Sequence, residues 1–479
     1  MQYSIVNKND LDNIAFRFDA EFYNPKHIKL STAIKSKSNI LLKDANIKID
    51  CSAFYPSIVP YYNFNKSGIP FLRVNEIQNG LLNISVDSVF LPNSILDENK
   101  STIAKTYFED IIIAKGGNTL GKVALITNDY SEYSICRDLI VLKTKDILNL
   151  NKYYLWIFLH SEIGQSILLR TASQTGQPHL TVEAIYNLTI PLFSRNFQNI
   201  FENIYKKIIF IKNESLKYYD FSKDFLLKEL NLLDLKPKHK LSFIKNYSDT
   251  EEAGRIDAEY FQPKYNEIID KIKNYKNGFE SLGNIFKLND KNYNPDDETE
   301  YNYIELANVS SNGDIKDITI DKGKNLPTRA RRKVNKDDVI LSSIEGSLSC
   351  ISLINESLNN ALCSTGFYVL KPDSINSETL FMMMKLNQFQ ALLKKGCSGT
   401  ILTSISKDEL KKIPIPKVDI KIQNEIKVNI KKSNDCIFKS KALLEIAKKG
   451  VEMAIEQDEE KAEKWIKEEV EKLGVKIDA

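Results

Sequence analysis

The sequence predicts an α+β protein in which two similar globular domains are separated by two long antiparallel helices that form a coiled-coil-like spacer with pseudo-two-fold symmetry. Three observations lead to this prediction. With 479 residues, the chain is too long for one ordinary hydrophobic core. The same series of short motifs occurs twice. Each series ends in a long seven-residue repeat of apolar and small side chains, which is typical of a helix that packs on another helix.

The repeat begins with a ten-residue motif. Residues 17–26 and 255–264 share Arg, Asp, Ala, Glu, Pro and Lys at equivalent positions. Further landmarks follow in the same order in both copies: 71–74 and 303–306, 110–114 and 338–342, 134–136 and 361–363, 188–191 and 413–416, and 198–199 and 423–424. The spacing between equivalent landmarks falls from 238 to 225 residues, as expected if loops vary in length on a shared scaffold.

Each copy has a globular part followed by a helix. The globular part contains short β-branched and aromatic runs bounded by Gly, Asn, Asp and Pro, which predicts a mostly β domain with a few helices, one of them around 153–170. We therefore expect a first domain at 1–195, a first spacer helix at 196–235, a linker and second domain at 236–420, and a second spacer helix with a C-terminal helical tail at 421–479.

The two helices carry matching apolar seams. Small residues on these seams would let two backbones approach closely, so we expect the helices to pack on each other. The alternative is that each is an ordinary amphipathic helix on its own domain. A helix of about 35 residues is roughly 50 Å long, a distance of one to two turns of B-DNA. The predicted spacer-helix interface consists of Ile204, Ile208, Ile211, Ser215, Ser222, Ile430, Ser433, Ile437, Ser440, Leu444 and Ala447.

With these features the chain resembles the specificity subunit of type I restriction-modification systems. The resemblance rests on the duplicated opening motif, the strand starts at Asp110 and Asp338, the segment 176–181, and Pro191 followed by Gln198. The second copy lacks the Gln-Pro-His of the first at its equivalent loop. The resemblance implies two target recognition domains that each read half of a split DNA sequence, and helices that set the gap and dock the methyltransferase subunits.

The resemblance also implies the partners: double-stranded DNA, two methyltransferase subunits and, in systems that cleave, restriction subunits. Catalysis would belong to those other chains, so we expect a non-catalytic subunit with no cofactor. Six scattered cysteines and four isolated histidines give no metal-site spacing, and we expect no metal and a cytoplasmic location. Two alternatives stay open: a stand-alone DNA methyltransferase or nuclease with unrecognised motifs, and a defence-related scaffold of the same shape that reads no sequence.

One glycine-rich segment imitates a nucleotide site. Residues 116–122 fall one residue short of a phosphate-binding loop, and Val123 occupies the position where the Mg²⁺-binding hydroxyl should be. A strand-like run follows where a helix should begin, so we expect a β-turn. Cys136 and Cys363 are expected to be buried small apolar side chains rather than nucleophiles.

Three groups of residues are candidates for DNA binding. The basic cluster Arg329, Arg331, Arg332 and Lys333 can clamp phosphates or read guanine, or it can be a solvated turn. A polar loop and its counterpart can read adenine through glutamine, or they can be plain loops. The glycine-rich turn can touch a phosphate. The remaining candidate residues are Ser173, Gln174 and Gln177, Ser398 and Thr400, and Lys115, Asn118 and Lys122.

Two further segments have predicted structural roles. Arg17 with Asp19, and Arg255 with Asp257, are expected to form structural contacts where the chain enters each domain. The tail at 456–472 alternates Glu and Lys around a narrow apolar edge, which predicts an exposed helix. That helix either docks a partner subunit or folds back on this chain.

Overall fold

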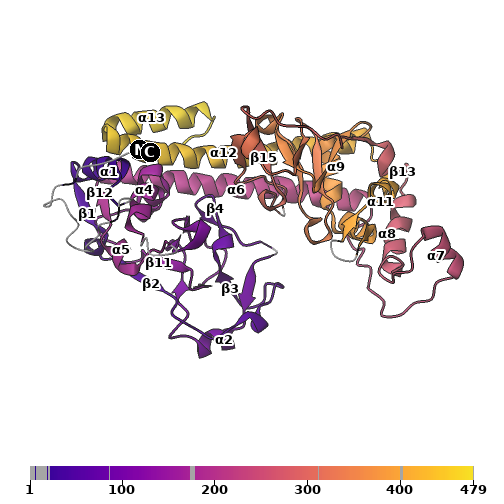
Figure 1. The fold of residues 1–479 in the computed structure, drawn as a ribbon, viewed down its shortest axis with the longest axis horizontal. Helices are drawn as coiled ribbons and strands as arrows, with labels where there is room; N and C mark the ends of the chain where they lie inside the picture. Colours follow the sequence, from indigo (N-terminus) through magenta and orange to yellow (C-terminus); the bar gives the residue numbers. More distant parts are fainter. Residues whose placement is uncertain are drawn as a thin grey trace. The chain divides into compact units, whose positions relative to one another are not determined.

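The computed structural model describes residues 22–85, 87–172, 178–310, 312–399 and 403–477, together with Val6 and Asp19 (Figure 1). The chain divides into two compact units. The first contains Met1–Lys212 and Ile437–Ala479, and the second contains Asn213–Cys436. Among the described residues, no helix combines the length and the apolar character needed to cross a membrane.

The first unit is built on two main sheets and a short third one. The strands of its six-stranded sheet, in spatial order, are β2 (Lys48–Cys51), β11 (Leu139–Lys143), β8 (Ile111–Ala114), β9 (Val123–Leu125), β5 (Leu81–Leu82) and β4 (Ile77–Gln78). Its four-stranded sheet contains β6 (Val89–Leu91), β3 (Ile69–Leu72), β10 (Tyr133–Ile135) and β7 (Lys105–Thr106). A two-stranded ladder joins β1 (Asn39–Leu41) to β12 (Thr189–Pro191).

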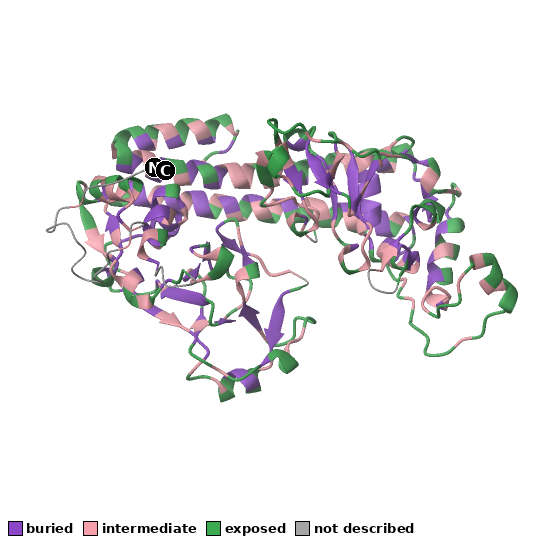
Figure 2. Cartoon of the chain, in the orientation of Figure 1, coloured by how far each residue is buried: buried purple, intermediate pink, exposed green. Residues whose placement is uncertain are grey.

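Helices cover this framework. They are α1 (Pro25–Lys35), α2 (Asn93–Glu98), α3 (Lys152–His160), α4 (Glu162–Thr171) and α5 (Val182–Tyr186). The single helix expected around 153–170 is thus two, because Ser161 ends α3 and its hydroxyl caps α4 by accepting the N–H of Gly164 at 3.1 Å. Figure 2 shows the buried residues gathered on the strands and on the inner helices.

The second unit repeats this plan. One four-stranded sheet contains β14 (Phe286–Leu288), β21 (Phe367–Pro372), β18 (Val339–Ser342) and β19 (Ile351–Leu353). The other contains β16 (Thr319–Lys322), β15 (Glu300–Ile304), β20 (Leu362–Ser364) and β17 (Ala330–Lys333). Two short ladders pair β13 (Phe279–Ser281) with β24 (Pro414–Pro416) and β22 (Cys397–Ser398) with β23 (Ser404–Ile405). Its short helices are α7 (Tyr247–Ala253), α8 (Pro263–Lys273), α9 (Ser377–Lys385), α10 (Asn387–Lys395) and α11 (Lys407–Lys412).

The main strand pairs recur in the two units, including one parallel pair. In the first, β3 and β10 run parallel with Phe71 opposite Ser134. In the second, β15 and β20 run parallel with Tyr303 opposite Leu362. The strand order β2-β11-β8-β9 likewise returns as β14-β21-β18-β19. The predicted duplication of an α+β domain is therefore confirmed at the level of topology.

The repeated aspartates hold the turn that precedes β8 and β18. Asp110 accepts two backbone N–H bonds, at 2.9 and 3.1 Å, and Asp338 accepts one from Asn335 at 2.8 Å. The residue before each has a positive φ, 72° at Glu109 and 68° at Asp337. Burial raises the pKa of both carboxyls, although the N–H bonds oppose that rise. These landmarks therefore anchor the scaffold.

The two long helices are α6 (Arg195–Glu229) and α12 (Ile420–Glu456). The first unit holds the N-terminal half of α6 and the C-terminal half of α12, and the second unit holds the other halves. Within the second unit, the hydroxyls of Ser215 and Ser433 lie 2.9 Å apart, and each hydroxyl also contacts the other residue's carbonyl oxygen, at 3.0 and 2.9 Å. The helices are therefore antiparallel and pack on each other, as predicted (Figure 1).

Most of the predicted seam is buried. Nine of its eleven residues are buried, and Ile437 and Ser440 are half-buried. Two seam serines do not bond across the helix pair, since Ser222 and Ser440 each donate to a carbonyl of their own helix at 2.9 Å. The Ser215–Ser433 contact is thus a direct polar link between the two helices.

A buried glutamine ties each long helix to its own domain. Gln198 accepts the N–H of Asn151 at 2.7 Å, and Gln423 accepts the N–H of Asn376 at 2.9 Å. Each glutamine amide also donates to the carbonyl five residues earlier, at 2.9 Å. Asn151 and Asn376 in turn cap α3 and α9. Each helix is consequently locked to the first turn of another helix of its domain.

The C-terminal tail folds back on the chain. Its helix α13 (Glu459–Lys472) buries Ala462, Ile466 and Val470. A Cβ placed on Gly450 of α12 would lie only 2.4 Å from Ile466 Cδ1, so glycine allows α13 to approach. Of the two predicted roles for this tail, the structure favours packing within the first unit.

Candidate nucleic-acid interface

Three connections leave the larger sheet of the first unit at the same end. Strand β2 ends at Cys51, and Ile140 near the start of β11 pairs with that residue. Strand β8 ends at Ala114, which pairs with Leu139, the first residue of β11. The loop after β2, the turn after β8 and the turn before β11 therefore converge.

Hydrogen bonds connect these segments to one another and to a fourth. The N–H of Lys115 donates to the carbonyl of Asp138 at 2.9 Å, and the N–H of Arg137 donates to the hydroxyl of Tyr55 at 3.4 Å. Gly116 and His179 form a β-bridge, with the N–H of the next residue, 180, bonded to the Lys115 carbonyl at 2.8 Å. We call residues 52–68, 115–122, 136–138 and 178–180 the first loop cluster.

The glycine-rich turn is not a nucleotide site. Residues 117–119 form a single 3₁₀ turn, and strand β9 follows where a phosphate-binding loop would open a helix. Lys115 is half-buried, and Asn118 and Lys122 are exposed. Lys122 also lines a cavity of about 810 Å³ with residues of α4, α12 and α13, including Trp465. The three predicted contacts are thus brought to one turn, with Lys122 on its cavity side.

Most residues of the predicted polar loop and its counterpart are outside the described part of the chain. Ser173, Gln174, Gln177 and Thr400 lie outside the described residues. The chain re-enters the described part at Pro178, directly before the Gly116–His179 bridge. In the second copy Ser398 is exposed on β22, where it pairs with Ser404.

The second unit has an equivalent cluster. Ser342 at the end of β18 pairs with Phe367 at the start of β21. The N–H of Ser343 donates to the Gly366 carbonyl at 2.9 Å, and the N–H of Glu345 donates to the Thr403 carbonyl at 2.9 Å. We call residues 289–299, 343–347, 365–366 and 403–405 the second loop cluster.

The basic cluster forms part of an edge strand rather than a turn. Three of its residues lie on β17 and reach the 289–299 loop. Arg331 donates to Asn294 Oδ1 at 2.7 Å, Arg332 donates to Asn292 Oδ1 at 2.8 Å, and the Lys333 ammonium lies 5.3 Å from the centre of the Tyr293 ring.

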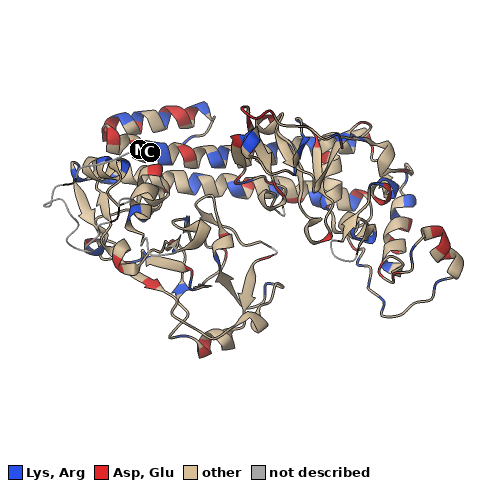
Figure 3. Cartoon of the chain, in the orientation of Figure 1, with Lys and Arg blue, Asp and Glu red and all other residues tan. Residues whose placement is uncertain are grey.

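Arg329 differs from its three neighbours. Its side chain is exposed, and its carbonyl accepts the N–H of Thr365 at 2.9 Å, which places it beside the second loop cluster. One acid of this loop is already paired: Glu298 contacts Lys322 and Lys324 at 2.8 and 2.7 Å, and these hydrogen bonds lower its pKa. The carboxylate of Glu298 is therefore partly neutralised, and Figure 3 shows Lys or Arg and Asp or Glu interspersed over the second unit.

The two suspected nucleophiles are buried, as predicted. Cys363 lies in β20, whereas Cys136 comes directly after β10 rather than inside a strand. Burial raises the pKa of the Cys136 thiol to about 11 and raises that of Cys363 as well. Among the residues that the structure describes, no three His, Cys, Asp or Glu side chains are grouped to hold a metal ion.

The repeated opening motif is structural in the second copy. Arg255 donates to both carboxylate oxygens of Asp257, at 2.8 and 3.1 Å, and to the Cys397 carbonyl at 2.8 Å. Asp257 accepts the N–H three residues on at 3.1 Å, just as Asp19 accepts that of Phe22 at 3.0 Å. The predicted structural role is supported for this pair, and Arg17 lies outside the described residues.

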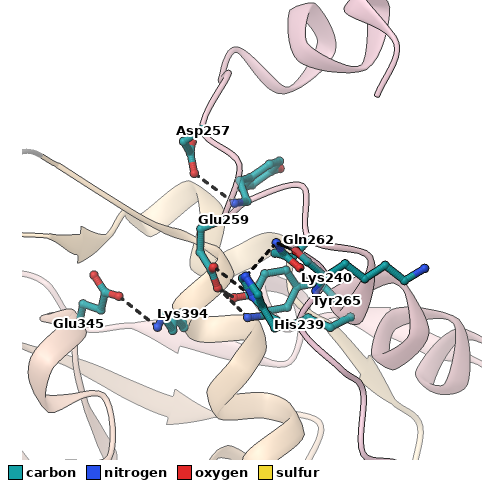
Figure 4. Close-up of polar contacts among 10 residues, drawn as sticks. His239, Lys240, Asp257, Glu259, Gln262, Tyr265, Glu345 and Lys394 are labelled. Carbon is teal, nitrogen blue, oxygen red and sulfur yellow. Dashed lines mark hydrogen bonds and ion pairs between the residues drawn. The ribbon is translucent and has the colours of Figure 1, made fainter. Parts of the chain in front are cut away.

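The same motif continues into a polar network at the start of the second domain (Figure 4). Glu259 accepts Lys264 Nζ at 2.8 Å and the Tyr265 hydroxyl. Although partial burial opposes it, these hydrogen bonds lower the pKa of Glu259. Gln262 bonds both the N–H and the carbonyl of Lys240 at 3.0 Å. The network joins the linker to α8.

Both halves of the chain match one protein family. The matches, at residues 60–202 and 276–437, are to the type I restriction modification DNA specificity domain. The chain belongs to this family. Each match includes the glycine-rich or equivalent turn, the closing strand and the start of a long helix. With two DNA specificity domains, the protein is a DNA sequence-recognition subunit of the type I restriction-modification kind.

Solved structures of specificity subunits align with most of this chain's length. The S subunit of a type I restriction-modification system from M. genitalium is 14% identical, with 90% of this chain and 95% of that chain covered and a TM-score of 0.36. The HsdS subunit from Thermoanaerobacter tengcongensis is 12% identical, with 88% and 96% covered and a TM-score of 0.27. No curated protein sequence matches the chain significantly.

One feature of this specificity subunit was missed by sequence reasoning. The loop at 52–68 exposes four large apolar side chains, Phe54, Val59, Tyr61 and Phe64. The available signal was a run of Phe, Tyr and Pro with a single charged residue, Lys66. Such a run is read as core until its burial is known.

Proposed function

We propose that this specificity subunit is non-catalytic, reads a bipartite asymmetric DNA target in the cytoplasm, and brings two methyltransferase subunits, with restriction subunits in systems that cleave, to that site. The observation that carries the proposal is the pair of loop clusters. They occupy equivalent places on equivalent sheets, yet their residues differ. Two readers of this kind suit a target whose halves differ in sequence.

The proposed mechanism separates positioning from reading. Lys115, Asn118 and Arg329 are suited to phosphate contacts, which orient a protein on DNA without reading sequence. Ser398 and the polar side chains at 173, 174, 177 and 400 are candidates for base edges. Arg331, Arg332 and Lys333 shape the 289–299 loop through their contacts with it. Because Gln198 and Gln423 lock each domain to a spacer helix, the helix pair would fix the gap that remains unread.

The absence of catalysis is part of the proposal. The sequence has no Asn/Asp-Pro-Pro-aromatic loop to hold a flipped adenine and no glycine turn that opens a helix for a cofactor. Methyl transfer and cleavage are accordingly assigned to partner chains.

Co-purification from the native host, followed by methylome sequencing, tests this function. We expect a stoichiometric methyltransferase and a methylation mark on a split motif that disappears when this chain is deleted. Methylation or cleavage by the purified chain alone, with S-adenosylmethionine or Mg²⁺, would instead support an enzyme. Binding that is independent of sequence at every salt concentration would support a scaffold.

A further inference from the structure

The loop between β2 and β3, residues 52–68, exposes apolar side chains in an unusual concentration. The exposed fractions are 77% for Phe54, 61% for Val59, 50% for Tyr61 and 56% for Phe64. Lys66 is its only charged residue, and Figure 3 shows mostly uncharged ribbon around β3. Leaving four such side chains in water forfeits the stabilisation that their burial would provide.

The loop is held in this exposed arrangement by its other residues. Ile58 is 4% exposed and belongs to the core. The rings of Tyr55 and Tyr62 lie 6.3 and 5.9 Å from the ring of Phe71. Asn63 exchanges two backbone hydrogen bonds with a residue of β6, at 2.9 and 3.1 Å. The exposed side chains therefore project from an anchored loop.

The loop is continuous with the rest of the first loop cluster. The Tyr55 hydroxyl accepts the N–H of Arg137, and the carbonyl of the next residue, Asp138, accepts the N–H of Lys115. Arg137 is itself exposed. The apolar side chains thus adjoin cations suited to a DNA backbone.

The equivalent loop of the second unit is different in kind. Residues 289–299 carry Asp290, Lys291, Asp296, Asp297 and Glu298. A methyltransferase that docks alike on both copies would require similar surfaces on both. A half-site reader is expected to differ, so this comparison favours DNA over a protein partner as the occupant.

We propose that Phe54, Val59, Tyr61 and Phe64 contact the bases of the half-site read by the first domain. Phe54, Val59 and Phe64 offer little to a phosphate, and all four side chains suit bases, either by packing on thymine methyl groups or by stacking against an opened base step. The proposal rests on the DNA-recognition function and assigns specificity-determining residues to the first domain.

The test uses the complex with its methyltransferase and the duplex target found by methylome sequencing. The variant is Phe54→Ser with Phe64→Ser, both exposed, so the fold should be unaffected. The matched control is Phe108→Ser, a 42%-exposed phenylalanine before β8, at the opposite end of the same sheet. We expect the double variant to bind its target at least tenfold more weakly with an unchanged salt slope, and the control to bind like the wild type.

Two modified duplexes distinguish the two base contacts. If thymine methyls are read, uracil in the first half-site weakens the wild type but not the double variant. If a base step is opened, the fluorescence of 2-aminopurine placed in the first half-site increases on binding of the wild type but not of the double variant. Wild-type affinity of the double variant, or loss of methyltransferase co-purification with DNA binding intact, would overturn the proposal. A wild-type complex that binds no specific sequence would instead refute the DNA function itself.

Discussion

Lengthening the spacer should lengthen the unread gap in the DNA target. The perturbation is a seven-residue insertion in α6 after Lys212, with a matching insertion in α12 after Cys436, where the two units divide. Because the seam repeats every seven residues, one heptad restores the same face to the partner helix. The Ser215–Ser433 contact lies on the second unit's side of both insertions and should be retained.

The expected change follows from helix dimensions. Seven residues at about 1.5 Å each add about 10 Å, or about three base pairs at ~3.4 Å. A single turn of about 5.4 Å corresponds to one or two base pairs on the same scale. After seven inserted residues, the apolar face of the helix points within about 20° of its original direction. Three base pairs rotate DNA by roughly 100°, given 10–10.5 base pairs per turn. We therefore expect a longer gap and weaker specific binding.

Methylome sequencing of a host that carries the altered subunit and its methyltransferase measures the gap directly. The control is the same heptad placed after Lys238, an exposed linker position outside the seam, which should leave the gap unchanged. An unchanged gap with the spacer insertions, or a changed gap with the linker insertion, would refute the proposal that the helix pair sets the gap.

Three further predictions test the scaffold and the interface. Gln423→Leu leaves the part-buried Asn376 N–H without its acceptor, and it should lower the free energy of unfolding by about 1–3 kcal/mol in urea denaturation. No loss of stability would argue against a glutamine that locks helix to domain. Gly450→Ala places a methyl group against Ile466, so it should dislodge α13 and speed tryptic cleavage of that helix. Adding Ile466→Ala should make room for the methyl group and restore protection. Cleavage of the single variant at the wild-type rate would contradict the packing argument. Arg329→Ala should weaken DNA binding on all sequences and reduce the salt slope by about 1, whereas loss confined to one sequence would identify a base contact.

The scaffold was predictable because its signals are local or repeated. The seven-residue seam identified the helix pair, and the recurrence of Asp110 as Asp338 identified equivalent turns. The structural role of each landmark could be assigned only from the three-dimensional structure. Seam serines can bond across the pair or back to their own helix, and the sequence does not distinguish Ser215 from Ser222.

The candidate interface was less predictable because it depends on contacts far apart in sequence. The arginine-rich cluster was recognised, but its bonds to the 289–299 loop cross about 40 residues. The exposed loop at 52–68 was missed because aromatic runs usually signal a core. Only the anchoring of Ile58 and Tyr62 reveals that their neighbours face outward.

The comparison of the two copies separates two tasks. Features that match are the aspartate-held turn, the parallel strand pair and the glutamine at each helix start; these build a domain and fix it to its helix. Two features that differ lie at one end of the sheets: an apolar loop with one charged residue against a loop with five, and a glycine-rich turn against the Glu345 turn. A duplicated domain that served one identical partner twice would need no such divergence at a single place. A target with two unlike halves does need it, because each domain must then reject the half-site that the other reads.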